Sequence, residues 1–478
     1  MKRIGLRDQR NAEAFGEENA ERLLDGRVAV VGSGSLGQLV MGSLAGLGVR
    51  GMYSVDDAVV LGNELEPLVL EKEKNASKVE VIGRSVRKIN EDAELKISCG
   101  RFQEWQIRSY SPQVVVDASN DPMKKLRCFD YCVDYRVPFI SGSTDRYKGR
   151  MVVFRPFSRL VDPGLRSRMI RSGFFFKNEL TLDAYVGKEQ SGVPSGVVAG
   201  LIVDQVKRVL LNEERGDIFE EINYNLYSRK RFGRNDSIVN CFSDYSKYTA
   251  VVVGAGALGN FVGMQLALLG WGKVLIYDDD RIEAHNRNRQ MMFHSGNEGE
   301  MKSRVLSERM RAINANVAVE GYEKRFVLGD GFSGADLVFS CVDTARTRYE
   351  ISKQALQDEV PVVDGGTTAR NGRISIFVPG ETSCLNCQNN FKEMADRREK
   401  AEQKRLREGG CLYAERSVVV PNIIIGSAMV GEGLKIVYSG KQKGILEGNF
   451  FYESTRKDRP FYLGPRIKLG TEECICLD

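Results

Sequence analysis

The sequence predicts an α/β protein made of two doubly wound domains in tandem, and three observations support this fold class. The chain has 478 residues, which is too long for one typical hydrophobic core. An apolar strand, a glycine-rich turn and an apolar helix-length segment occur twice, with Gly254 placed 222 positions after Gly32. Two later segments, 137–144 and 148–154, repeat at 360–367 and 371–377. We therefore expect domains at about 1–215 and 216–478, the first and second copies.

The composition is that of an ordinary globular protein, with 42% hydrophobic and 28% charged residues. A net charge of +5 over this length gives no reason to expect nucleic acid as a partner. Two apolar runs, Val28–Val49 and Val251–Gly272, are long enough to suggest membrane spans. Their ordered glycines favour nucleotide-binding turns instead. The first residues lack an apolar core, which predicts no secretory signal and a cytoplasmic protein.

The second copy begins with a short buried strand, Val251–Val253, followed by a GxGxxG turn. Its glycines are Gly254, Gly256 and Gly259, and the first copy has Gly32, Gly34 and Gly37 at the same spacing. A strand, a glycine turn and a helix in this order present backbone N–H groups to a nucleotide phosphate. Alone, the pattern would equally suit an NAD-binding oxidoreductase.

The residues after the next strand make the second copy more specific. That strand, Val274–Tyr277, ends in Asp278, which is placed to bind a ribose hydroxyl. Arg289 and Lys302 follow, and these cations suit a triphosphate because they neutralise charge on phosphoryl oxygens. A surface network of ion pairs is the alternative interpretation.

In the order GxGxxG, DxD, NxxRQ and a downstream lysine, the second copy resembles the ThiF/MoeB/ubiquitin-activating enzyme family. The resemblance implies ATP and Mg²⁺ as cofactors. It implies nucleotide binding by Gly254, Gly256, Gly259, Asp278, Asp280, Asn286 and Gln290, and catalytic roles for Arg289, Lys302 and Asp343. Asp343 follows a buried strand, and similar enzymes have an aspartate there that helps to hold Mg²⁺ or to orient the reacting groups. It could also cap the following helix.

The same motifs are altered in the first copy. In the alignment of the two copies, Val55 stands at the place of Asp278, and Asp57 at that of Asp280. Asn63 matches Asn286, Lys78 falls near the place of Lys302, Glu66 replaces Arg289, and Asn120 replaces Asp343. We interpret these changes as loss of the ribose acid, the phosphate-binding arginine and the late aspartate. The first copy is therefore expected to be inactive toward ATP.

The resemblance further implies that Arg10 reaches the nucleotide of the second copy, in the manner of an arginine finger. Two copies in one chain would then pack as an internal pseudo-two-fold dimer. A solvated N-terminal arginine is the alternative interpretation of Arg10.

Five cysteines have candidate roles. Cys384-x-x-Cys387 and Cys474-x-Cys476 would supply four thiolates to a structural Zn²⁺, similar to the zinc knot of the family, in which C-x-x-C is usual in both halves. Redox-active or free cysteines are the alternative. Cys411 lies in the crossover segment 388–420, where thioester-forming members of the family carry their cysteine. An unreactive residue or a metal ligand is the other possibility.

The functional expectation is ATP-dependent adenylation of the C-terminal carboxylate of a ubiquitin-like (β-grasp) protein. Transfer of the acyl group to Cys411 and hand-off to a conjugating enzyme would follow. The alternatives are activation of a sulfur-carrier protein, adenylation of a precursor peptide, an NAD-binding oxidoreductase and a non-catalytic nucleotide-binding scaffold.

Overall fold

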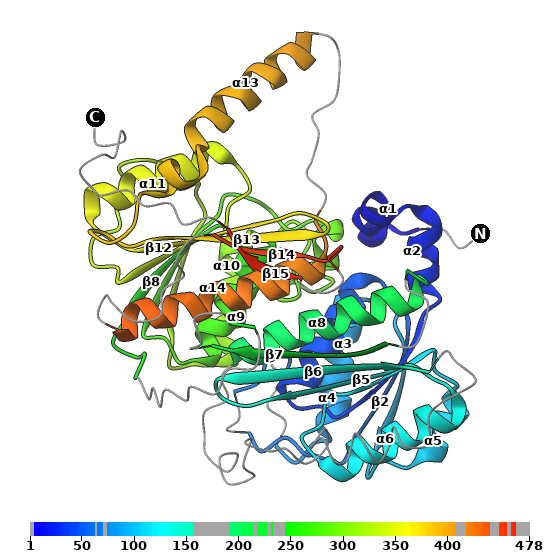
Figure 1. Cartoon of the computed structure of the whole chain (residues 1–478). Helices are drawn as coiled ribbons and strands as arrows, with labels where there is room; N and C mark the ends of the chain where they lie inside the picture. The colour runs from blue at the N-terminus through cyan, green and yellow to red at the C-terminus, as the bar shows by residue number, and fades with distance from the viewer. Residues whose placement is uncertain are drawn as a thin grey trace. The chain divides into compact units, whose positions relative to one another are not determined.

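In a computed structural model the chain forms two compact units (Figure 1). The structure describes residues 4–62, 65–69, 74–156, 192–213, 218–226, 231–232, 244–407, 417–439, 449–456 and 460–464. The first unit comprises Met1–Leu226, Lys230–Asp236 and Arg287–Gly296. The second comprises Tyr227–Arg229, Ser237–Asn286 and Asn297–Asp478.

The first unit is built on a seven-stranded sheet in the order β3-β2-β1-β4-β5-β6-β7. The first five strands in this order are parallel, and β6 and β7 are antiparallel additions. The strands are β1 (Arg27–Val31), β2 (Gly51–Asp56), β3 (Glu94–Cys99), β4 (Val114–Asp117), β5 (Phe139–Thr144), β6 (Lys148–Arg155) and β7 (Ile218–Asn225).

Helices cover both faces of this sheet. On one face α3 packs against α4 and α8, and on the other α5 packs against α6 over an aromatic core that includes Tyr53, Phe129 and Phe139 (Figure 1). The N-terminal helices α1 and α2 precede β1. The helices are η1 (Leu6–Asp8), α1 (Gln9–Phe15), α2 (Glu17–Leu24), α3 (Ser35–Leu47), α4 (Lys78–Ile89), α5 (Glu104–Tyr110), α6 (Pro122–Tyr135) and α8 (Gly192–Leu210).

The second unit repeats this plan with the strand order β10-β9-β8-β11-β12-β13-β14-β15. Strands β10 to β12 in this order are parallel, and β13, β14 and β15 continue the sheet antiparallel. The strands are β8 (Thr249–Val253), β9 (Lys273–Tyr277), β10 (Ala318–Tyr322), β11 (Leu337–Ser340), β12 (Val362–Thr367), β13 (Asn371–Phe377), β14 (Phe450–Glu453) and β15 (Phe461–Leu463).

Its helices are likewise divided between two faces. Helix α9 packs between α10 and α14, whereas α11, α12 and α13 form a separate group (Figure 1). The helices are α9 (Ala257–Leu268), η3 (Ala284–Asn288), α10 (Lys302–Ile313), α11 (Ala345–Asp358), α12 (Leu385–Asn389), α13 (Phe391–Arg407) and α14 (Val419–Ser439). By length and composition α14 could cross a membrane, but its apolar stretch Val419–Val437 is wholly buried in the fold, as in a core helix.

The equivalent strand orders confirm the prediction of two tandem α/β domains with parallel-rich sheets. Two features of the chain path differ from the simple division at residue 215. Strand β7 completes the first sheet, so the first unit extends to Leu226. The segment Arg287–Gly296 also belongs to the first unit, although the chain before and after it belongs to the second.

Candidate nucleotide-binding site

The glycine turn of the second unit joins β8 to α9, and two of its glycines are required by close backbone approaches. Gly254 has a φ of 97°, and a Cβ there would lie 2.8 Å from the carbonyl oxygen of Cys341. A Cβ at Gly259 would collide with the carbonyl oxygen of Gly254. Gly256 is the N-cap of α9 and provides no side-chain cap, so the first N–H groups of the helix remain available to an anion.

Asp278 closes this turn from the end of β9. Its Oδ2 accepts a hydrogen bond from the Ala255 N–H at 2.6 Å, and its Oδ1 accepts one from the Asp280 N–H at 2.9 Å. Burial raises the pKa of Asp278 to about 6, while Lys302 and the two backbone donors act in the opposite direction. The carboxylate is therefore ionised above that pH and protonated below it. The raised pKa means that ionising Asp278 lowers the stability of the folded state. Such unfavourably placed ionisable groups are concentrated at functional sites, which makes Asp278 a functional-site candidate.

Lys302 is the first residue of α10 and faces the same turn. Its buried Nζ forms an ion pair with Asp280 Oδ2 at 2.6 Å, whereas the Asp280 side chain is 64% exposed. The Lys302 N–H also donates to the Asp280 carbonyl oxygen at 3.0 Å, which fixes the start of the helix. Because the Asp280 end of this ion pair is largely exposed to water, the pair contributes little free energy, and the ammonium can exchange it for a phosphate at little cost.

The NxxRQ motif is divided between the two units. Asn286 ends the second-unit portion, and its Oδ1 accepts a hydrogen bond from the Glu283 N–H at 3.0 Å. Arg289 and Gln290 lie in the first unit. Arg289 donates to Asn288 Oδ1 at 2.7 Å, and the buried Gln290 Oε1 has no hydrogen-bond partner among the described residues.

Asp343 is exposed on its unit, whereas Arg10 is half-buried. Asp343 is exposed in the loop between β11 and α11, and this loop packs against Gly254. The N-cap of α11 is Thr344, whose hydroxyl accepts from the Thr347 N–H at 3.3 Å, so the helix-capping alternative for Asp343 is wrong. Arg10 lies on α1 and forms an ion pair with Glu13 at 2.7 Å. Its predicted contact with ATP stays a prediction.

The first unit contains the same turn, and it corrects one expectation from the sequence. Asp56 Oδ2 accepts from the Ser33 N–H at 2.5 Å, and its Oδ1 accepts from the Ala58 N–H at 2.8 Å. These bonds match those of Asp278. Strand register gives the reason, because Val31 pairs with Val55 as Val253 pairs with Tyr277. Asp56, and not Val55, is therefore the counterpart of Asp278, and the ribose acid is retained in the first copy.

By the same register Ala58, and not Asp57, stands at the place of Asp280. The Lys78 N–H donates to the Ala58 carbonyl oxygen at 3.0 Å, as the Lys302 N–H does to Asp280, which confirms Lys78 as the counterpart of Lys302. The exposed acid that partners Lys302 in the second unit is thus missing from the first.

Lys78 instead has a buried partner. Its Nζ lies 2.8 Å from Oε1 of Glu66, whose other oxygen accepts from Gln38 Nε2 at 2.7 Å. Glu66 is only 2% exposed. The lysine that would meet a phosphate in the first copy is therefore committed to an internal carboxylate, and the added negative charge opposes an anion there.

Of the cysteines predicted to bind zinc or form a thioester, Cys384 and Cys387 lie among the described residues. Cys384 is the N-cap of α12, and its Sγ accepts a hydrogen bond from the Cys387 N–H at 3.4 Å, so these two thiols share one turn. Cys411, Cys474 and Cys476 lie outside the described residues. Within the described ranges no three metal-ligating side chains come together. The zinc site stays a prediction.

Comparison with known proteins places the chain in a family. The ThiF family matches residues 6–238 and again 227–474. Ubiquitin-like modifier-activating enzyme 5 of Dictyostelium discoideum is 28% identical over 185 residues, covering 35% of this chain and 48% of that protein. SUMO-activating enzyme subunit 2 of the same organism is 30% identical over 142 residues, covering 29% of this chain and 22% of that protein.

Two further matches have different names. Adenylyltransferase and sulfurtransferase UBA4 of Meyerozyma guilliermondii is 29% identical over 192 residues, covering 38% of this chain and 43% of that protein. The crystal structure of E. coli MccB with ATP matches with a TM-score of 0.39 at 19% identity, covering 48% of this chain and 67% of MccB. The chain spans less than half the length of each of these three curated relatives. Because the two family matches together span both copies, the protein belongs to the ThiF family.

Proposed function

We propose that the second copy uses ATP to adenylate the C-terminal carboxylate of a ubiquitin-like protein. The observation that carries this proposal is the contrast between two equivalent lysines. Lys302 is paired with an exposed aspartate, whereas Lys78 is paired with the buried Glu66. Relatives named as ubiquitin-like modifier-activating and SUMO-activating enzymes support the choice of substrate.

In the proposed reaction a carboxylate oxygen attacks the α-phosphorus of ATP. A new P–O bond forms, the bond from the α-phosphorus to the bridging oxygen breaks, and pyrophosphate leaves with the electron pair. The attacking carboxylate is already ionised at about pH 7, so no general base is required. Catalysis is then alignment and neutralisation of charge on the phosphoryl oxygens.

The residues of the second copy divide this work. The α9 N-terminus and Gln290 would contact phosphate, Asp278 would accept hydrogen bonds from ribose hydroxyls, and Arg289 and Lys302 would neutralise the developing charge. The exposed carboxylate of Asp343 has the oxygen donors that Mg²⁺ prefers, which fits a role in holding the ion, and Mg²⁺ would supply further positive charge at the phosphates when bound.

The second step of the proposal is transfer to a thiol. The thiolate of Cys411 would attack the carbonyl carbon of the acyl-adenylate, forming a thioester and releasing AMP. In the sequence Cys411 follows two glycines and comes after the charged helix α13, whose lysines and arginines favour the thiolate form of a nearby cysteine. The thioester would then pass to a conjugating enzyme.

The experiment that tests this function combines pyrophosphate exchange with a non-reducing gel. The full chain, ATP, Mg²⁺ and small ubiquitin-like proteins should give exchange and a thiol-sensitive adduct. Cys411→Ala should abolish the adduct and leave exchange intact. Cys99→Ala is the matched control, because Cys99 is exposed in the first unit and has no proposed role. Absence of exchange with every ubiquitin-like protein tested would contradict the proposal.

A second candidate function is activation of a sulfur-carrier protein. It is supported by the similarity to the relative named adenylyltransferase and sulfurtransferase UBA4. This function predicts the same exchange reaction, but the acyl group would pass to a sulfur donor. Exchange without any gel-visible thioester, in the chain with all its cysteines, would favour it.

A further inference from the structure

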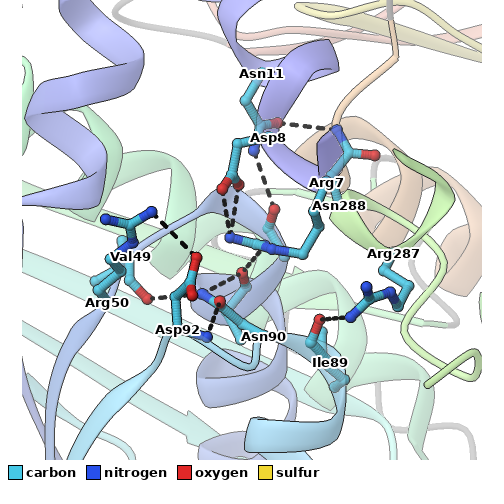
Figure 2. Close-up of polar contacts among 12 residues, drawn as sticks. Arg7, Asp8, Asn11, Val49, Arg50, Ile89, Asn90, Asp92, Arg287 and Asn288 are labelled. Carbon is cyan, nitrogen blue, oxygen red and sulfur yellow. Dashed lines mark hydrogen bonds and ion pairs between the residues drawn. The ribbon is translucent and has the colours of Figure 1, made fainter. Parts of the chain in front are cut away.

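The segment Arg287–Gly296, which carries most of the NxxRQ motif, is anchored in the first unit by several contacts (Figure 2). The Arg287 guanidinium donates to the Ile89 carbonyl oxygen at 3.5 Å and lies 3.6 Å from a carboxylate oxygen of Glu91. Near its other end, the Ser295 N–H donates to the Lys88 carbonyl oxygen at 2.8 Å. The end of α4 therefore holds this segment at both of its ends.

Helix α3 provides the surface under the middle of the segment. A Cβ at Gly46 would lie 2.8 Å from the carbonyl oxygen of Asn288, and a Cβ at Gly42 would collide with the Met291 side chain. The Ser43 hydroxyl contacts Met291 Sδ at 3.5 Å. Glycines four residues apart thus let the segment lie directly on the helix.

A chain of buried hydrogen bonds connects this surface to Arg289. Asn11 Nδ2 donates to the Gly46 carbonyl oxygen at 3.1 Å, and Asn11 Oδ1 accepts from Asn288 Nδ2 at 3.0 Å (Figure 2). Asn288 Oδ1 then accepts from the Arg289 guanidinium at 2.7 Å. Asn11 is 1% exposed and Asn288 is fully buried.

The order of donors and acceptors in this chain fixes the orientation of each amide. A side-chain amide has one acceptor oxygen and one donor nitrogen. The Gly46 carbonyl can only accept, so Asn11 must direct its nitrogen to Gly46 and its oxygen to Asn288. Asn288 must then direct its nitrogen to Asn11 and its oxygen to Arg289. The arginine guanidinium can only donate, so it requires the same orientation of Asn288, and Asn11 holds the amide in that orientation by accepting from its nitrogen.

We propose that Asn11 of the first copy is a positioning residue for Arg289, the phosphate-binding arginine of the second copy. The inference rests on the function proposed above. It assigns a role in the reaction to a copy in which Glu66 replaces the phosphate-binding arginine. The role differs from that of Arg10, because Asn11 acts through Asn288 and touches no substrate.

The test measures the affinity of the full chain for ATP with Mg²⁺ and, separately, for adenosine. Asn11→Ala should weaken ATP binding about 5- to 30-fold, the loss expected when a buried hydrogen-bonding group loses its partner, and should leave adenosine binding unchanged. Asn11→Leu fills the same space without polar atoms, so it serves if Asn11→Ala destabilises the fold. It should weaken ATP binding by a similar factor and leave adenosine binding unchanged. Asn19→Ala is the control, because the Asn19 side-chain amide lies in the same N-terminal helical region and donates to the Phe15 carbonyl oxygen at 3.0 Å, a bond that does not involve the segment.

A double-mutant cycle separates positioning from a general effect on the fold. In the Arg289→Ala background, Asn11→Ala should have no further effect on ATP affinity beyond about twofold. Hydrogen exchange of residues 287–296 should increase in Asn11→Ala and not in Asn19→Ala. An equal loss of ATP affinity from Asn11→Ala in the unaltered and Arg289→Ala backgrounds would overturn the inference. Unchanged hydrogen exchange of residues 287–296 in Asn11→Ala would also overturn it. If Arg289→Ala itself leaves ATP affinity unchanged, the role proposed for Arg289 is wrong. Hydrogen exchange of residues 287–296 then still shows whether Asn11 holds the segment in place.

Discussion

Replacement of Arg289 by alanine is expected to slow ATP–pyrophosphate exchange by about 10²- to 10³-fold, the usual loss when one preorganised donor to a developing charge is removed. The guanidinium is the cationic group of the NxxRQ motif and is oriented by Asn288. In the proposed reaction its charge is needed most when negative charge accumulates on the phosphoryl oxygens. Exchange is measured with the ubiquitin-like protein that gives the highest rate with the unaltered chain.

Arg281→Ala is the control for this substitution. Arg281 precedes the motif by a few residues and donates to the Gly299 carbonyl oxygen at 2.7 Å on the exposed surface. It should leave exchange within about twofold of the unaltered rate, since exposed polar contacts contribute little. A similar loss in both variants, or little loss in either, would contradict the role proposed for Arg289.

Replacement of Lys78 by methionine is expected to destabilise the first unit by about 3–5 kcal/mol, because it leaves a buried carboxylate without its ion-pair partner. That carboxylate is Glu66, which is 2% exposed and 2.8 Å from the lysine. Because the chain has two units, one overall unfolding free energy is not defined. Hydrogen exchange under native conditions reports the opening free energy of first-unit peptides separately.

Two further variants show whether the effect comes from the unpaired charge. Adding Glu66→Gln to Lys78→Met removes the charge and should restore much of the stability. Lys302→Met, the same change at the equivalent place in the second copy, should cost at most about 1 kcal/mol, because Asp280 is 64% exposed. It should weaken ATP binding instead. Equal stability losses at Lys78 and Lys302 would show that the two lysines have not diverged as described.

The repeat in the sequence was sufficient to predict the fold of both copies. The glycine turns are the clearest case, because Gly254 and Gly259 are required by backbone approaches that any strand–turn–helix unit of this kind makes. The approximate correspondence of Lys78 and Lys302 could also be predicted. Each of these features depends on residues close together in the sequence, so residue spacing alone predicts it.

Features that depend on register or on distant contacts could not be predicted in the same way. Matching Val55 to Asp278 used an offset one residue too large, and only the pairing of β1 with β2 assigns Asp56 to that place. The bond between Asn11 and Asn288 joins residues 277 positions apart, so no local pattern marks it.

The central claim is that only the second copy binds ATP, although both copies keep the glycine turn and its aspartate. The most direct test is calorimetric titration of the full chain with ATP and Mg²⁺ at about pH 8, where Asp278, with its pKa raised to about 6, is ionised. Asp278→Asn and Asp56→Asn are matched variants, because each aspartate accepts two equivalent backbone hydrogen bonds. We expect one ATP per chain, bound about 10- to 100-fold more weakly in Asp278→Asn, as for loss of hydrogen bonds to a charged group, and equally well in Asp56→Asn. Two ATP molecules per chain, or binding lost in Asp56→Asn and kept in Asp278→Asn, would contradict the account.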